Sequence, residues 1–188
     1  MLAVAACAGS VATLSARAGD DPRTESVVGV LPLGHPDQRN VELVEAALKR
    51  TYRFKVVELK GVPLPDSAYY APRHRYRAEK LIAFEQKWPT WKVIGVTDRD
   101  ISTTLYKSKD FGIMGFGYIG GRSCVVSSHR PHERVGIIAI HEIGHTLGLP
   151  HCPNPKCVMR DGEGKGLVAK TTGKFCAVCA SKIRQWLR

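Results

Sequence analysis

Three closely spaced histidines can bind one metal ion. His141 and His145 are four positions apart, so in a helix their imidazoles lie on one face, one turn apart. Gly148 permits the left-handed turn that ends a helix, and Pro150 cannot continue one. The chain then turns back and brings His151 to the same ion. We therefore predict that His141, His145 and His151 are the metal ligands.

The residue beside the first histidine has the chemistry of a general base. Three neutral imidazoles leave the fourth position of a tetrahedral zinc ion open to water, as in catalytic sites, and zinc lowers the pKa of that water to about 7. Glu142 can stand over this water without being a ligand. The pattern predicts peptide-bond hydrolysis. The alternative is a buried apolar helix with incidental histidines, but core packing would not require this spacing.

Four of the six cysteines form two pairs that follow the histidines, with spacings C-x4-C and C-x2-C: Cys152, Cys157, Cys176 and Cys179. Such pairs can close on one structural zinc ion. Because Cys152 follows His151 directly, this site would also hold the segment of the third histidine in place. Two disulfides are the alternative, which export to an oxidising compartment would favour. Cys124, within an expected strand, is predicted to be a buried apolar residue.

The elements that position these residues follow from hydrophobic periodicity. Strands are expected at 27–31, 54–59, 93–96 and 123–127, and helices at 41–52, after a cap at Asp37, and at 78–88, before Pro89. A proline-rich loop with Tyr69 and Tyr70 is expected at 62–72. The zinc-binding helix is expected to start at Pro131, with Glu133 in its first turn. Residues 112–121, rich in glycine, are predicted to be an irregular edge strand to which an extended peptide adds by main-chain pairing.

Length and charge set limits on the class of protein. A chain of 188 residues is long enough for one domain with its own core. The formal net charge of +11 favours anionic partners. The basic residues are scattered, so we expect a peptide or protein substrate and not nucleic acid as the partner. The second hypothesis is a catalytically silent, zinc-organised binding module for nucleic acid or protein. This alternative gives Glu142 no role. We expect a monomer.

The N-terminal segment indicates export. Residues 1–18 contain an alanine-rich apolar run followed by Ala16-Arg17-Ala18, which has the form of a signal-peptide cleavage site, and 19–26 is a polar linker. The basic start of a signal peptide is missing. Val4-Ala5-Ala6-Cys7 resembles a lipoprotein signal, which makes a lipid anchor at Cys7 a second interpretation. We expect a periplasmic, secreted or lipid-anchored protein, with a cytoplasmic location as the alternative. No other apolar run is long enough to span a bilayer.

The combined motifs resemble one family. His-Glu-x-x-His-x-x-Gly-x-x-His is the metzincin signature. In this sequence it runs from His141 to His151 and is followed by Cys152-x4-Cys157-x-Met159 and later by Cys176-x-x-Cys179. This combination resembles the archaemetzincins, and the resemblance covers roughly residues 27 to 180. The spacing from Met159 to the third cysteine, at sixteen residues, is about one residue shorter than in that family.

The resemblance implies a fold and a set of roles. The expected fold is a single α/β metzincin-like domain with a mixed twisted sheet, an edge strand over the active-site helix and a small C-terminal four-cysteine zinc subdomain. The catalytic core would be 27–151 and the C-terminal part 152–188. The chain would be a zinc metallopeptidase with two zinc ions, one catalytic and one structural. Glu142 would act as base and then acid, and Met159 would form a turn beneath the catalytic zinc.

Overall fold

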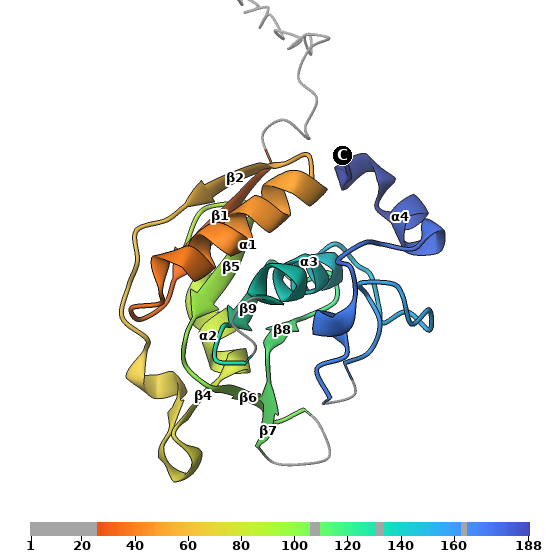
Figure 1. Ribbon diagram of the computed structural model, residues 1–188. Coiled ribbons are helices and arrows are strands. Elements are labelled where there is room, and N and C mark those ends of the chain that lie inside the picture. The colour runs from red at the N-terminus through yellow and green to blue at the C-terminus, as the bar shows by residue number, and fades with distance from the viewer. Residues whose placement is uncertain (1–25, 106–109, 131–133, 163–164) are drawn as a thin grey trace, which may run out of the picture.

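A five-stranded mixed sheet forms the centre of the molecule (Figure 1). The computed structural model describes residues 26–105, 110–130, 134–162 and 165–188. The strand order is β2-β1-β5-β9-β8, in which β8 is an antiparallel edge strand and the others run parallel. The strands are β1 (Val27–Pro32), β2 (Lys55–Glu58), β5 (Lys92–Thr97), β8 (Gly115–Gly117) and β9 (Ser123–Ser127). The expected mixed α/β architecture with an edge strand is confirmed.

The central strands are apolar on both faces because helices cover both faces. The helices α1 (Gln38–Thr51) and α3 (Val135–Thr146) lie on one side, and α2 (Ala78–Glu85) lies on the other. Successive residues of β1 alternate accordingly: Val30 belongs to the core beneath α1 and α3, and Leu31 to the core beneath α2. Asp37 caps α1 as expected, since its side chain accepts a hydrogen bond from the backbone N–H of Arg39.

A second, smaller sheet extends the fold at one end. It has the order β3-β4-β6-β7 and consists of β3 (Tyr69–Tyr70), β4 (Arg75–Arg77), β6 (Ile101–Thr103) and β7 (Phe111–Ile113). Arg77 lies 2.8 Å from the carboxylate of Asp110, and Arg75 lies 2.7 Å from that of Asp100. These largely buried ion pairs tie β4 to the residues just before β7 and β6 respectively. The chain then passes from β7 directly into β8 of the main sheet.

Several expectations about single elements are wrong. The segment 62–72 is not only loop, because Tyr69 and Tyr70 pair with β4. The glycine-rich edge strand is divided between two sheets, as β7 and β8. The helix α2 ends at Glu85, well before Pro89. The zinc-binding helix begins at Val135, and Pro131 and Glu133 lie outside the described residues, as do the predicted signal segment and all of the polar linker except Ser26.

The C-terminal part packs against the segment between α1 and β2 and against the residues before β5. It contains the short helix α4 (Ala177–Lys182) and the 3-10 turns η4 (Val168–Lys170) and η5 (Arg184–Trp186). Two further 3-10 turns, η1 (Asp66–Ala68) and η2 (Ala71–Arg73), flank β3. The rings of Trp186 and Trp91 have centroids 4.7 Å apart, and Arg53 donates a backbone hydrogen bond to the Trp186 carbonyl. Within the described ranges, no helix has the length and apolarity needed to cross a bilayer.

One carboxyl group is buried beneath the sheet with almost no polar contacts. Glu85, on α2, is 0% exposed, and no side chain of the described residues donates a hydrogen bond to its carboxylate. It occupies the space left by Gly95, where a Cβ atom would lie 2.2 Å from its Oε1 atom. Burial raises the pKa of Glu85 well above its ordinary value, and the backbone of Gly95 offsets only part of this effect, so the carboxyl group favours its neutral form.

The burial of the Glu85 carboxyl group predicts that the stability of the fold depends on pH. Below the unfolded-state pKa of about 4.3, both states carry the proton, whereas at higher pH only the unfolded state releases it readily, which destabilises the fold. We expect Glu85→Gln to stabilise the protein relative to the parent by roughly 1–3 kcal/mol near pH 7, and by less near pH 5. Denaturant unfolding at both pH values measures this difference.

Glu79, on the same helix, provides the control. Burial raises its pKa, but hydrogen bonds from Thr103 and Thr104 outweigh this effect and lower the pKa overall. Its contribution to stability is therefore present above the unfolded-state pKa and lost as the pH falls, so Glu79→Gln should destabilise the protein more at high pH than at low pH. A Glu85→Gln difference that does not change with pH would contradict the account.

Candidate metal centres

The three predicted histidines converge. One ring nitrogen from each of His141, His145 and His151 lies within 4.8 Å of the others. Helix α3 carries the first two, and Gly148, with φ of 95°, turns the chain back to the third. His141 and His145 are buried, whereas the side chain of His151 is 37% exposed. The arrangement therefore has two ligands in the interior and one at the opening.

Main-chain carbonyls fix the tautomers of the two buried histidines. The Nδ1 atoms of His141 and His145 each donate to a carbonyl, Val158 O and Leu149 O respectively, at 2.7 Å. Burial, together with the neighbouring His145, lowers the pKa of His141 to about 3, and burial lowers the pKa of His145 to about 4. Both rings are therefore neutral at pH 7, with a proton on Nδ1 and a free lone pair on Nε2.

The two free lone pairs face each other. The Nε2 atoms of His141 and His145 are 2.9 Å apart, and neither carries a proton to share. Two acceptor nitrogens at this distance repel each other unless a cation lies between them. The geometry thus fits a divalent metal, and neutral imidazoles are the form that binds one.

Glu142 faces the edge strand. It is 5% exposed, and burial raises the pKa of its carboxyl group well above the ordinary value. A Cβ atom at Gly115 of β8 would lie 2.5 Å from the Oε1 atom of Glu142, and one at Gly117 would lie 3.4 Å from Oε2. The glycines of β8 therefore leave the space that this carboxyl group occupies between α3 and the strand.

Met159 packs against the helix that carries the first two histidines. It is fully buried, and a Cβ atom at Gly144 would lie 2.5 Å from its sulfur. Gly144, between the two helical histidines, therefore allows the methionine to contact the helix. Its neighbour Val158 supplies the carbonyl that binds His141, so the turn orients a candidate ligand directly.

The four C-terminal cysteines also converge. Their sulfur atoms lie within 4.8 Å of one another, and all four are free thiols: Cys152, Cys157, Cys176 and Cys179. The Sγ atoms of Cys152 and Cys176 are 3.8 Å apart. Thiolates at the usual zinc–sulfur distance of about 2.3 Å in a tetrahedron are separated by about the same amount, 3.8 Å. The geometry therefore fits zinc and not two disulfides. Cys124 is buried in β9 as predicted.

Hydrogen bonds connect the two clusters. The backbone N–H of Cys152 donates to the Met159 carbonyl at 2.7 Å, and that of Val158 donates to the Lys174 carbonyl at 2.8 Å. The same Val158 binds His141 through its own carbonyl. The segment between the cysteine pairs is thus tied to the histidine site, and folding of the cysteine cluster fixes the positions of groups that orient the histidines.

A cleft runs along the histidines. Its volume is about 960 Å³, and β7, β8 and α3 form its walls. Apolar side chains such as Phe111, Ile113 and Val168 line much of it, together with the three histidines and Glu142. This cavity is within the range of volumes typical of ligand sites.

Known proteins share this arrangement. Residues 131–185 match the model of peptidase family M54. The archaemetzincin of Archaeoglobus fulgidus is 34% identical over 157 residues, which cover 79% of this chain and 93% of that protein. The chain belongs to the archaemetzincin family. The archaemetzincin of Natronomonas pharaonis is 29% identical over 174 residues, covering 83% of this chain and 98% of that protein.

Solved archaemetzincin structures agree with the fold. The crystal structure of the Archaeoglobus fulgidus protein complexed with malonate has a TM-score of 0.73 at 30% identity and covers 84% of this chain and 99% of that chain. That of the Methanopyrus kandleri archaemetzincin also has a TM-score of 0.73, at 28% identity, and covers 88% and 97% of the two chains.

Membership of this family makes the chain a zinc-dependent metallopeptidase that acts on peptides or proteins. The histidine and cysteine clusters fit one catalytic and one structural zinc site, so the expected cofactors are confirmed. The comparisons do not favour the alternative hypothesis of a silent binding module.

Asp161 is a candidate site residue that the sequence analysis missed. Its carboxylate lies 3.5 Å from the Nδ1 atom of His151, where the other two histidines have main-chain carbonyls. A carboxylate at this position holds the ring so that Nε2 faces the metal. The sequence feature that could have indicated this role is the position of Asp161, two residues after Met159.

This contact predicts a change in zinc affinity. We expect Asp161→Asn to weaken zinc binding at the histidine cluster by about 10–100-fold, without affecting the second zinc ion. Competition with a chromophoric chelator measures both affinities directly. Asp98→Asn, which removes an equally negative side chain from another loop, should change neither. An Asp161→Asn protein that retains both zinc ions with parental affinity would show that this carboxylate does not position His151.

Proposed function

We propose that His141, His145 and His151 bind the catalytic zinc of this archaemetzincin and that Glu142 is its general base. Zinc, when bound, supplies a Lewis acid that polarises a substrate carbonyl and makes water a nucleophile near pH 7. The observation that carries the proposal is the convergence of two neutral imidazoles with facing lone pairs. His151, which follows the turn that ends α3, is the third ligand.

Glu142 performs the proton transfers. Its carboxylate accepts a proton from the attacking water as the new C–O bond forms. It then donates that proton to the amide nitrogen as the C–N bond breaks, so the leaving group departs as a neutral amine. Burial between α3 and the glycines of β8 keeps bulk water from this carboxyl group and fixes its direction.

We propose that the substrate binds as an extra strand along β8. In the sheet, β8 pairs with β9 on one side only, and in the described part of the chain no other strand covers its second edge. An extended peptide can pair with that edge through main-chain hydrogen bonds. The apolar side chains of the cleft, among them Ile113 and Val168, would then contact apolar side chains of the peptide.

We further propose that Cys152, Cys157, Cys176 and Cys179 hold the structural zinc. Their tetrahedral spacing and free thiols support this role. Bound there, the ion would restrain the segment of 152–176 that carries Met159 and the carbonyl of Val158.

The role of Glu142 is tested by removing its charge. We expect Glu142→Gln to bind both zinc ions normally and to lower kcat by about 10²–10⁴-fold, because the amide cannot accept the proton. Metal analysis and steady-state assays on a fluorogenic peptide provide the two measurements. Gly115→Ala should also lower kcat with zinc retained, since its methyl group would displace the carboxylate.

The matched control is Gly61→Ala, in the segment that follows β2. A Cβ atom at Gly61 would lie 3.3 Å from the Pro32 side chain, and no group of the histidine cluster is among its nearest neighbours. It should retain nearly full kcat. If Glu142→Gln retained the parental kcat, the proposed mechanism would be wrong, regardless of the kcat values of the glycine variants.

We also propose that the protein is exported and acts as a monomer. The apolar run and the Ala16-Arg17-Ala18 sequence support export, with acylation of Cys7 as the lipid-anchored form. A single chain supplies both metal clusters, which supports action as a monomer. Mass spectrometry of the protein made in its native host should find a chain that starts near Gly19, or an acylated Cys7. An intact cytoplasmic N-terminus would contradict export.

A further inference from the structure

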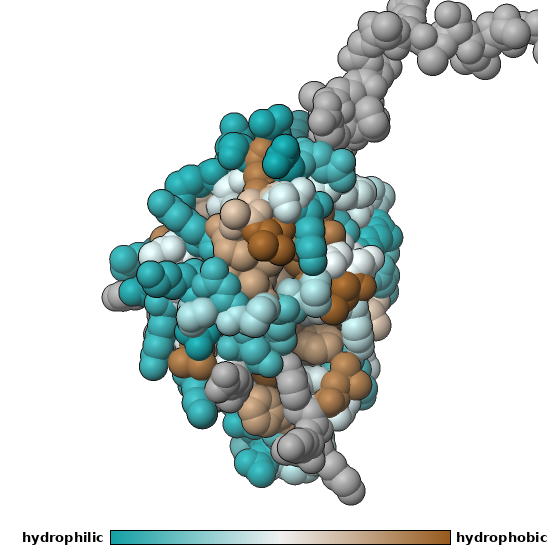
Figure 2. Space-filling view, turned by 90° about the vertical axis from the view of Figure 1, so that its right-hand side faces the viewer, coloured by the Kyte–Doolittle hydropathy of each residue, from teal (hydrophilic) through white to brown (hydrophobic). Residues whose placement is uncertain are grey.

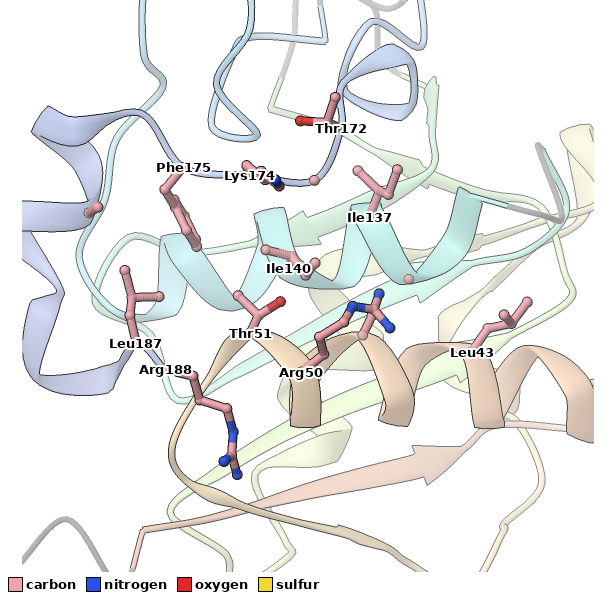
Figure 3. A pocket seen from close by; sticks show the side chains of 14 residues that line it. Leu43, Arg50, Thr51, Ile137, Ile140, Thr172, Lys174, Phe175, Leu187 and Arg188 are labelled. Atoms are coloured by element: carbon pink, nitrogen blue, oxygen red, sulfur yellow. The ribbon is translucent and has the colours of Figure 1, made fainter.

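A second cavity lies behind the active-site helix. Its volume is about 470 Å³, and it is enclosed by α1, α3, the segment 172–175 and the C-terminal residues (Figure 3). Gly136, Ile137 and Ile140 of α3 line this cavity, whereas Ile138, His141, Glu142 and His145 line the catalytic cleft. The two cavities therefore lie on opposite faces of one helix.

The inner surface of the cavity is mostly apolar. Ile137 and Ile140 of α3, Leu43 and Ala47 of α1, and Phe175 and Leu187 of the C-terminal part contribute to it. Phe175 is held in place by its edge contact with Tyr52, at a centroid distance of 6.1 Å. The Phe175 side of the cavity is thus fixed by ring packing against Tyr52.

The opening of the cavity is cationic. Arg50, Lys174 and Arg188 line it, and none of its lining residues is acidic. Arg188 donates to the Tyr52 carbonyl, and its side chain points away from the cavity, whereas that of Arg50 reaches toward α3 (Figure 3). Neither Arg50 nor Lys174 forms an ion pair with a carboxylate of the described residues. Two cationic side chains therefore border an apolar space that no Asp or Glu side chain lines.

We propose that this cavity binds a small anionic amphiphile, namely a single acyl chain with a terminal carboxylate. The apolar walls would bury the chain, and Arg50 and Lys174 would bind the carboxylate by charge-assisted hydrogen bonds. A volume of about 470 Å³ is within the range of small-molecule sites. The ligand would lie against the back of the helix that carries His141 and His145. This site is independent of the proposed catalytic roles.

The shape of the site argues against a bilayer as the occupant. Side chains that insert into membranes protrude from the surface. None of the exposed large hydrophobic residues of the described surface lines this cavity. These exposed residues are Tyr69, Leu105, Tyr118, Ile119 and Val178. On the face shown in Figure 2, hydrophobic groups form small patches in a largely hydrophilic surface. The apolar groups of the cavity are recessed and suit a ligand that enters as a single molecule.

Calorimetric titration of the zinc-loaded protein with decanoate, kept below its micelle concentration, tests the site. We expect one decanoate per cavity, and binding at least about tenfold weaker for decyltrimethylammonium, which has the same chain and the opposite charge. The double variant Arg50→Glu, Lys174→Glu should weaken decanoate binding by about tenfold or more. Lys55→Glu, Lys60→Glu, an equal change of net charge on exposed residues away from the cavity, should bind as the parent does.

Unchanged binding by the cavity variant would overturn the proposal, because decanoate would then occupy the catalytic cleft or another surface. Equally weakened decanoate binding by the Lys55→Glu, Lys60→Glu control would also overturn it, because that result would show a general effect of net charge. Absence of any decanoate binding to the parent would overturn it as well. Far-ultraviolet circular dichroism and zinc content establish that both variants are folded, so that weaker binding is assigned to the lost cations.

Discussion

Two unprotonated nitrogens held 2.9 Å apart are the constraint on which this structure depends. The carbonyl oxygens of Val158 and Leu149 accept hydrogen bonds from Nδ1–H of His141 and His145, and burial keeps both rings neutral. The polypeptide alone cannot satisfy the two facing lone pairs. A metal ion can, so the energetic cost of burying two histidines side by side becomes affinity for zinc.

The rest of the fold serves to maintain that arrangement. Helix α3 lies on the central sheet, and Gly136 lets it approach α1 closely, since a Cβ atom there would be 2.8 Å from the Leu43 carbonyl. Gly144 admits Met159 beneath the helix, and Gly115 admits Glu142 beside the strand. Each contact would be lost with a larger residue. Glycine is needed here for close approach and not for unusual backbone angles.

Sequence reasoning predicted the chemistry better than the architecture around it. The spacing of His141, His145 and His151 has few explanations other than one metal ion, and the cysteine pairs are similarly restrictive. The edge strand was placed correctly, but its division between two sheets was not predicted, because local composition does not show where a chain leaves one sheet for another.

The contacts missed from the sequence are those made across long separations or by the main chain. A carbonyl such as Val158 O has no sequence signature, and Asp161 is an ordinary turn residue until His151 is placed beside it. The same holds for Glu85, whose carboxyl group is buried in the space that Gly95 of β5 leaves open. Side-chain type predicts which groups are able to react, and only the fold shows which groups orient them.

Anomalous diffraction at the zinc edge from crystals of the purified protein tests the central claim most directly. We expect one zinc peak about 2.0–2.1 Å from a ring nitrogen of each of His141, His145 and His151, and a second peak about 2.3 Å from the four cysteine sulfurs. The first ion should retain a coordination position that no protein atom fills. A histidine cluster without zinc, or a zinc ion there that His151 does not contact, would contradict the account.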